Sequence, residues 1–136
     1  MPNSNSWSPE HSVRIAELDA QHQRLFRIVQ DLEGAIAAGR GRQAIEAIID
    51  RAVNYTIEHF STEEGLMEQY GYPGLAAHRI EHNKLTLEIS NLQKEHSAES
   101  PDAAERFLKF LRKWFDEHIL KSDQEYAPFL GSKGLK

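Results

Sequence analysis

The apolar positions of this 136-residue chain recur at intervals of three and four, the period of one buried face of an α-helix. In the segment at about 19–38 the repeating positions are Leu18, His22, Leu25, Val29, Leu32 and Ile36. Segments at about 43–70, 75–96 and 102–121 show the same period. Stretches rich in glycine, proline or serine separate them at 39–41, 70–74 and 97–101. The pattern therefore predicts four helices and no strand.

Four amphipathic helices with short connections pack most simply as an antiparallel up-down-up-down bundle. We therefore predict an all-α fold in which residues 1–136 form a single domain. Residues 1–18 are expected to form an irregular N-terminal arm, fastened to the bundle by Trp7, Val13 and Ile15. Ser100 is the expected N-cap of the last helix.

Polar residues occupy several of the inward positions. Five of the seven histidines and one glutamate lie on these rows: His22, His59, His78, His82, His118 and Glu63. A single histidine on an apolar face is usually a hydrogen-bonded core residue, but a small core cannot provide partners for all six side chains. Because a divalent cation binds neutral imidazoles and carboxylates together, the set predicts a metal centre. His11 and His96 lie off the rows.

The spacing of these residues is compatible with shared metal sites. Residues four apart on a helix lie about 40° apart around its axis, so His59 can share a site with Glu63, and His78 with His82. His118 and Asp123 are five residues apart, or about 140°, and both reach one site only if the helix loosens after Lys121. Otherwise Asp123 is a solvated acid at the end of a helix.

The ligand types narrow the choice of metal. The chain has no cysteine, which excludes disulfides and thiolate ligands. The candidates are too many for one four-coordinate zinc ion, so two metal ions are expected. The sequence contains neither the Glu-x-x-His pairs of ferritin-like sites nor an HExxH motif. A histidine-rich set suits iron better than magnesium or calcium.

Charge and hydropathy exclude other partners. With 16 basic and 21 acidic residues the net charge is −5, so no basic footprint for nucleic acid is expected. No apolar stretch approaches the ~18 residues of a membrane span, and the first ten residues do not resemble a signal peptide. We therefore predict a cytoplasmic chain with no membrane attachment of its own, unless it belongs to a larger protein.

Five features together resemble the hemerythrin family, specifically its bacterial hemerythrin-like domains. They are Trp7, LDAQHQRLF around His22, HFSTEEGLM from His59, HRIEH from His78 and WFDEHILKSDQEY from Trp114. Each motif alone is weakly specific, but the resemblance extends from Trp7 to Tyr126 and retains every ligand position of the family.

The resemblance implies a non-haem diiron centre with an oxo or hydroxo bridge. The implied ligands are His78, His82 and His118 for one iron, His22 and His59 for the other, and Glu63 and Asp123 as bridges. One coordination position then stays open on the iron held by His22 and His59, where dioxygen would bind.

A dry apolar pocket is expected beside the open position, because external protons would end reversible binding. Its candidate residues are Phe26, Phe60, Trp114, Phe115 and Ile119, and the last of these matches the residue that follows the final histidine ligand in the family. Each is equally explained as ordinary bundle core. The glutamates that precede ligand histidines, Glu58, Glu81 and Glu117, are expected to face solvent, since helix neighbours point about 100° apart.

The function that these features favour is reversible dioxygen binding, for carriage, storage, delivery or sensing. Because similar domains occur in signalling proteins, the chain could be a domain of one. The alternative is a diiron enzyme that activates oxygen, peroxide or nitric oxide, although no acid–base pair or organic-substrate site is evident beside the ligands. Iron storage and a purely structural metal are weaker alternatives.

Overall fold

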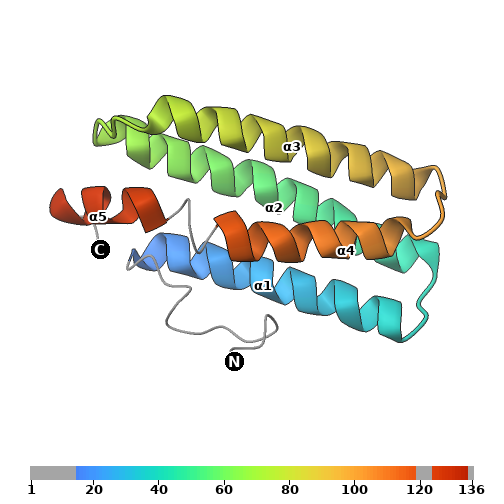
Figure 1. Cartoon of the computed structure of the whole chain (residues 1–136). Helices are drawn as coiled ribbons and strands as arrows, with labels where there is room; N and C mark the ends of the chain where they lie inside the picture. The colour runs from blue at the N-terminus through green and yellow to red at the C-terminus, as the bar shows by residue number, and fades with distance from the viewer. Residues whose placement is uncertain (1–14, 119–123, 135–136) are drawn as a thin grey trace.

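The computed structural model describes residues 15–118 and 124–134, and these residues form helices and turns without strands. The helices are α1 (Ala16–Ala37), α2 (Arg42–Gln69), α3 (Leu75–Ser97), α4 (Ala103–Trp114) and the short α5 (Gln124–Ser132). Figure 1 shows α1–α4 side by side along one axis, with α5 beyond the end of α4. The all-α antiparallel bundle predicted from the sequence is confirmed.

Each long helix packs against its neighbours in the chain, and α4 closes the bundle by packing against both α3 and α1 (Figure 1). The connections are short. Gly39 and Gly71, which follow α1 and α2, have φ angles of +67° and +69°, a left-handed conformation that glycine adopts without strain. These tight turns bring consecutive helices into antiparallel contact.

Helix α1 begins at Ala16, earlier than the predicted start at about residue 19. Ile15, just before it, is 1% exposed and packs in the core as expected. Trp7 and Val13 lie outside the described residues. The predicted Ser100 cap of the fourth helix is wrong, because a turn places Asp102 directly before α4, with a φ of +57°. The Ser100 carbonyl instead accepts a hydrogen bond from the N–H of Ala103 at 3.3 Å.

The fourth helix ends earlier than the predicted residue 121. The α-helix stops at Trp114, and residues 115–118 form a wider π-helical turn. Such turns displace the side chains that follow them and are frequent at functional sites. The predicted loosening after Lys121 lies outside the described residues.

Helix α5 was not predicted. Its nine residues include Pro128, and they are too few to show a clear helical period. Its buried residues pack with the start of α1 and the end of α2 in a small apolar cluster: Ile15, Leu18, Met67, Tyr126, Ala127 and Leu130.

A second, larger apolar cluster fills the rest of the bundle, from Leu25 in α1 to Phe115 after α4. Along α1, His22 lies between Leu18 of the small cluster and Leu25 of the large one. The polar inward residues therefore sit between two apolar clusters, and α5 closes the nearer end of the bundle.

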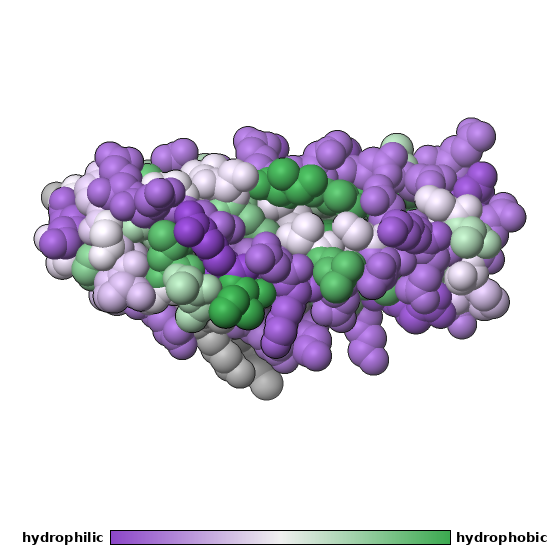
Figure 2. Space-filling model, turned by 90° about the horizontal axis from the view of Figure 1, so that it is seen from above, coloured by the Kyte–Doolittle hydropathy of each residue, from purple (hydrophilic) through white to green (hydrophobic). Residues whose placement is uncertain are grey.

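The surface is mostly hydrophilic. Figure 2, a view onto the α3 side, shows small hydrophobic areas among polar side chains. Ile57, Ile80 and Leu87 are the large apolar side chains that the structure shows exposed in its described part. In that part, none of the helices has the length and apolar character needed to cross a membrane.

Gly34 and Gly65 lie inside helices, and no neighbouring atom of the described structure lies within 4 Å of a Cβ added at either position. Gly65→Ala should therefore raise the unfolding free energy of the metal-free chain by about 0.5–1 kcal/mol, because alanine restricts the unfolded chain. Urea denaturation measures this value. Gly39→Ala is the control and should lower it by about 1–2 kcal/mol, because its backbone is left-handed. Equal effects at both positions would contradict this interpretation.

Candidate metal centre

The polar inward residues meet near the end of the bundle that α5 closes. His22 comes from the second turn of α1, and His59 and Glu63 come from the second half of α2. His78 and His82 lie in the first two turns of α3, and His118 is the last residue of the π-helical turn after α4. All six of these side chains are buried, none more than 4% exposed. Antiparallel packing thus gathers residues that are up to 96 positions apart (118 − 22).

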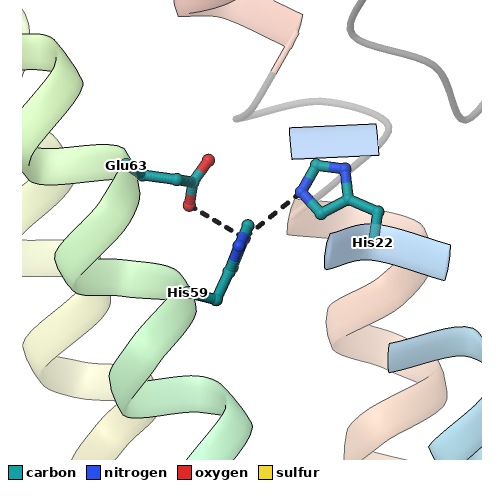
Figure 3. Close-up of side chains that lie close together, drawn as sticks. All are labelled: His22, His59 and Glu63. Atoms are coloured by element: carbon teal, nitrogen blue, oxygen red, sulfur yellow. Dashed lines mark hydrogen bonds and ion pairs between the residues drawn. The ribbon is translucent and has the colours of Figure 1, made fainter. Parts of the chain in front are cut away.

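Helices α1 and α2 provide one group of ligand atoms. The Nε2 atoms of His22 and His59 lie 3.2 Å apart, and His59 Nε2 lies 3.1 Å from Glu63 Oε1. Figure 3 shows the three side chains pointing toward one another across the gap between the two helices. His59 and Glu63, four residues apart, face the same point as their spacing predicts.

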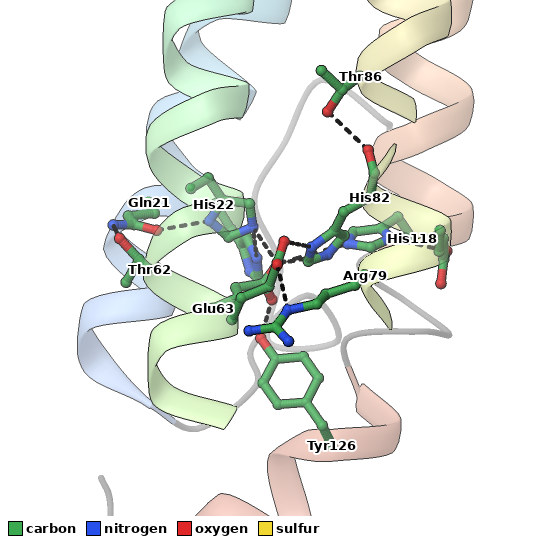
Figure 4. Close-up of polar contacts among 12 residues, drawn as sticks. Gln21, His22, Thr62, Glu63, Arg79, His82, Thr86, His118 and Tyr126 are labelled. Carbon is green, nitrogen blue, oxygen red and sulfur yellow. Dashed lines mark hydrogen bonds and ion pairs between the residues drawn. The ribbon is translucent and has the colours of Figure 1, made fainter. Parts of the chain in front are cut away.

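Helices α3 and α4 provide a second group on the other side of Glu63. His82 Nε2 lies 3.5 Å and His118 Nε2 3.8 Å from the same Oε1 atom (Figure 4). In each group, His22–His59–Glu63 and Glu63–His82–His118, the potential ligand atoms all lie within 4.8 Å of one another. The two groups share a single carboxylate.

His78 and Asp123 complete the predicted ligand set less directly. The His78 ring is buried next to the second group, with its centroid 5.8 Å from that of His82 and 6.5 Å from that of His118. It is not part of the close-packed group of ligand atoms. Asp123 lies outside the described residues.

In three of the histidine rings, the Nδ1 atom donates a hydrogen bond to a side-chain oxygen. His59 Nδ1 donates to Gln21 Oε1 at 2.7 Å, His82 Nδ1 to Glu64 Oε2 at 2.9 Å, and His118 Nδ1 to Glu81 Oε1 at 3.0 Å. Amide and carboxylate oxygens only accept, so Nδ1 carries the proton in each ring. The Nε2 lone pair of each neutral ring then faces Glu63, which is the arrangement that a metal ligand needs.

Sequence reasoning missed these three partners. Glu81 was expected to face solvent, and its side chain is 38% exposed, but it also accepts a hydrogen bond from His118, which the sequence did not predict. Glu58 and Glu117 are exposed as expected. No pattern in the sequence distinguishes Gln21 or Glu64, since their roles depend on which helices become neighbours.

Tyr126 is a further residue that the sequence did not indicate. Its ring is fully buried on α5, and its hydroxyl donates a hydrogen bond to Glu63 Oε2 (Figure 4). Oε1 is left to face the histidines.

Electrostatics keep Glu63 ionised. Burial raises the pKa of its carboxyl, but when protons instead of a metal occupy the Nε2 atoms, the positive charge of His59 and hydrogen bonds from His118, His59 and His82 outweigh burial. The pKa of Glu63 therefore lies well below its ordinary value of 4.5. At neutral pH the centre holds a buried negative charge.

The residues fit a pair of iron ions. Glu63 Oε1 and His82 Nε2 are buried acceptors without a hydrogen bond in the described structure, although they lie only 3.5 Å apart. Two lone pairs that face each other out of water are unfavourable unless a cation lies between or beside them. Imidazole nitrogens and a carboxylate suit iron, and the shared carboxylate suits two ions.

Aromatic side chains enclose the centre. Phe60 stacks on the His82 ring with centroids 3.8 Å apart, and Trp114 meets Phe60 edge-on at 5.4 Å. Phe26 and Phe115 pack together at 5.6 Å, and all four side chains are buried. Ile119 lies outside the described residues.

Comparisons with known proteins agree with this geometry. The family model described as the hemerythrin HHE cation binding domain matches residues 13–130. The chain belongs to the hemerythrin family. A bacteriohemerythrin from Methylococcus capsulatus is 33% identical over 123 residues, with 90% of this chain and 93% of the relative covered. One from Stenotrophomonas maltophilia is 32% identical, with 89% and 78% covered.

A solved structure of wild-type hemerythrin superposes with a TM-score of 0.84 at 33% identity, covering 92% of this chain and 96% of the other. Hemerythrins are oxygen-binding proteins with a diiron centre. This chain is therefore a hemerythrin-family oxygen-binding protein rather than an enzyme, and its cofactor is the diiron centre.

Glu63→Ala should lower the iron content from two ions per chain, because it removes the carboxylate that both histidine groups share. The measurement is elemental analysis after anaerobic loading with ferrous iron and desalting. His96→Ala is the matched control: His96 is also buried on the bundle but lies at the far end of α3. It should lower stability by about 0.5–3 kcal/mol and leave the iron content unchanged. Iron loss with His96→Ala and not with Glu63→Ala would contradict the assignment.

Proposed function

We propose that the chain binds dioxygen reversibly at an iron pair held on both sides of Glu63. The proposed ligands are His78, His82 and His118 for one iron, His22 and His59 for the other, and Glu63 and Asp123 as bridges. The observation that carries this proposal is the Glu63 carboxylate, because two separate histidine groups share it.

When bound, the diiron centre supplies the electrons for reversible oxygen binding. The protein's part is to hold the ligands without rearrangement. The Nδ1 hydrogen bonds to Gln21, Glu64 and Glu81 fix three rings, and Tyr126 fixes one oxygen of Glu63. These contacts fix the orientation of the ligands, so little ordering entropy is lost on metal binding.

The aromatic walls support reversible binding rather than turnover. Phe26, Phe60, Trp114 and Phe115 are at most 7% exposed, and Phe60 and Trp114 pack against the histidine rings. Such walls keep water and protons away from the bound oxygen. We include Ile119 in this pocket on the family resemblance.

The cellular location and the partners of the protein are proposed from its sequence. We propose a cytoplasmic chain that does not bind nucleic acid, because its net charge is −5 and no basic segment is evident. A place in a larger signalling protein stays a hypothesis that the family resemblance suggests.

The experiment that tests the proposal is an anaerobic oxygen titration of the reduced, iron-loaded chain, followed by its visible absorption. We expect a new charge-transfer band that saturates at one dioxygen per iron pair and disappears when argon replaces oxygen. A band that decays at once to a stable oxidised spectrum, with no return under argon, would contradict reversible binding and favour the enzyme alternative.

Phe60→Leu should shorten the lifetime of the oxygen-dependent spectrum, because it removes the ring that covers His82 and opens a path for water. Repeated oxygen–argon cycles measure that lifetime. Phe107→Leu makes the same change in a fully buried core residue of α4 and should leave the lifetime unchanged. Equal lifetimes for the two variants would contradict a protective role for Phe60.

A further inference from the structure

The hydrogen-bond partners of the ligand histidines differ in charge between the two halves of the centre. His59, in the α1–α2 half, is held by the neutral amide of Gln21. His82 and His118, in the α3–α4 half, are held by the carboxylates of Glu64 and Glu81. A carboxylate partner makes an imidazole a stronger donor to a metal than an amide does, because its charge favours positive charge on the ring and metal.

Each of the two carboxylates holds one ring. Glu64 also accepts from Arg79 Nε at 3.1 Å, and Arg79 in turn contacts Glu68 at 3.4 Å. The charge of Glu64 is therefore shared with a guanidinium group. Glu81 Oε1 lies 3.0 Å from His118 Nδ1, and this contact offers a direct test of what a charged partner does to a ligand ring.

The difference in burial explains why a charged side chain is tolerated at the position of Glu81 but would be unfavourable at the position of Gln21. The Glu81 side chain is 38% exposed, while the His118 ring that it holds is 2% exposed. Glu81 and His118 both line a cavity of about 160 Å³ between α3 and α4, with Glu88, Lys113 and Trp114. Because the Glu81 carboxylate is accessible to solvent, its charge costs little. Gln21 is only 9% exposed, where an ionised side chain would be costly.

We propose that Glu81 is a positioning residue whose charge strengthens metal binding by His118 and makes the two halves of the centre unequal. This inference rests on the proposed diiron function. The hydrogen bond holds Nδ1, so Nε2 points at Glu63, and the charge stabilises the cation on the α3–α4 side. His118 follows a π-helical turn rather than a regular helix, so it depends on this contact for its orientation.

The test is an anaerobic titration of the metal-free chain with Co²⁺, followed by visible absorption. Wild type should bind two ions in unequal steps. Glu81→Gln keeps the size of the side chain and an acceptor oxygen but removes the charge. This variant should raise the dissociation constant of one Co²⁺-binding step by about tenfold and leave that of the other step within about twofold of wild type.

Glu88→Gln is the matched control. Glu88 lines the same cavity, so this variant removes the same charge without removing a partner of His118. It should leave both steps unchanged. In the iron-loaded chain, Glu81→Gln should also raise the reduction potential of the iron centre, because the negative charge near His118 is lost. If Glu81 only positioned the ring, the glutamine amide would keep that contact and the potential would not change.

Two cobalt ions bound equally well by wild type and Glu81→Gln would overturn the role of Glu81 while leaving the diiron proposal intact. The same holds if Glu88→Gln weakens binding as much as Glu81→Gln, since a general charge effect would then suffice. A wild-type chain that binds only one Co²⁺ would overturn the two-metal function itself.

Discussion

The burial of an ionised carboxylate among four imidazoles is the constraint on which the rest of this structure depends. The Glu63 side chain is fully buried, and its Oε1 atom lies 3.1 Å, 3.5 Å and 3.8 Å from the Nε2 atoms of His59, His82 and His118. Among the described residues, Glu63 Oε1 and the His82 Nε2 atom that faces it have no hydrogen bond, so a cation is needed to complete the cluster. The metal centre is thus part of the folded core rather than an addition to its surface.

The architecture separates the polar centre from two apolar clusters. The larger cluster fills the length of the bundle, and the smaller one, closed by α5, covers the end next to the ligands. Tyr126 joins α5 to the centre through its hydrogen bond to Glu63. Fold stability and ligand geometry are therefore coupled at this end of the molecule, and a loss of α5 packing would also release one oxygen of the central carboxylate.

The helical period was enough to predict four helices and the inward direction of the histidines, because both depend on local geometry. Side chains that act across helices were not predictable in this way. Glu81 was expected in solvent because it points about 100° away from the ligand His82 on the same helix, and only the packing of the chain after α4 reveals its contact with His118. Tyr126 lies on a helix too short for a clear period, and the π-helical turn at 115–118 has no sequence pattern that distinguishes it from a regular helix end.

The central claim is that Glu63 lies between two metal ions. Its most direct test is a crystal of the iron-loaded chain, with diffraction data collected on both sides of the iron absorption edge. The account predicts two anomalous peaks, one beside His22 and His59 and the other beside His82 and His118, with the Glu63 carboxylate between them. A single peak, or peaks away from Glu63, would contradict it.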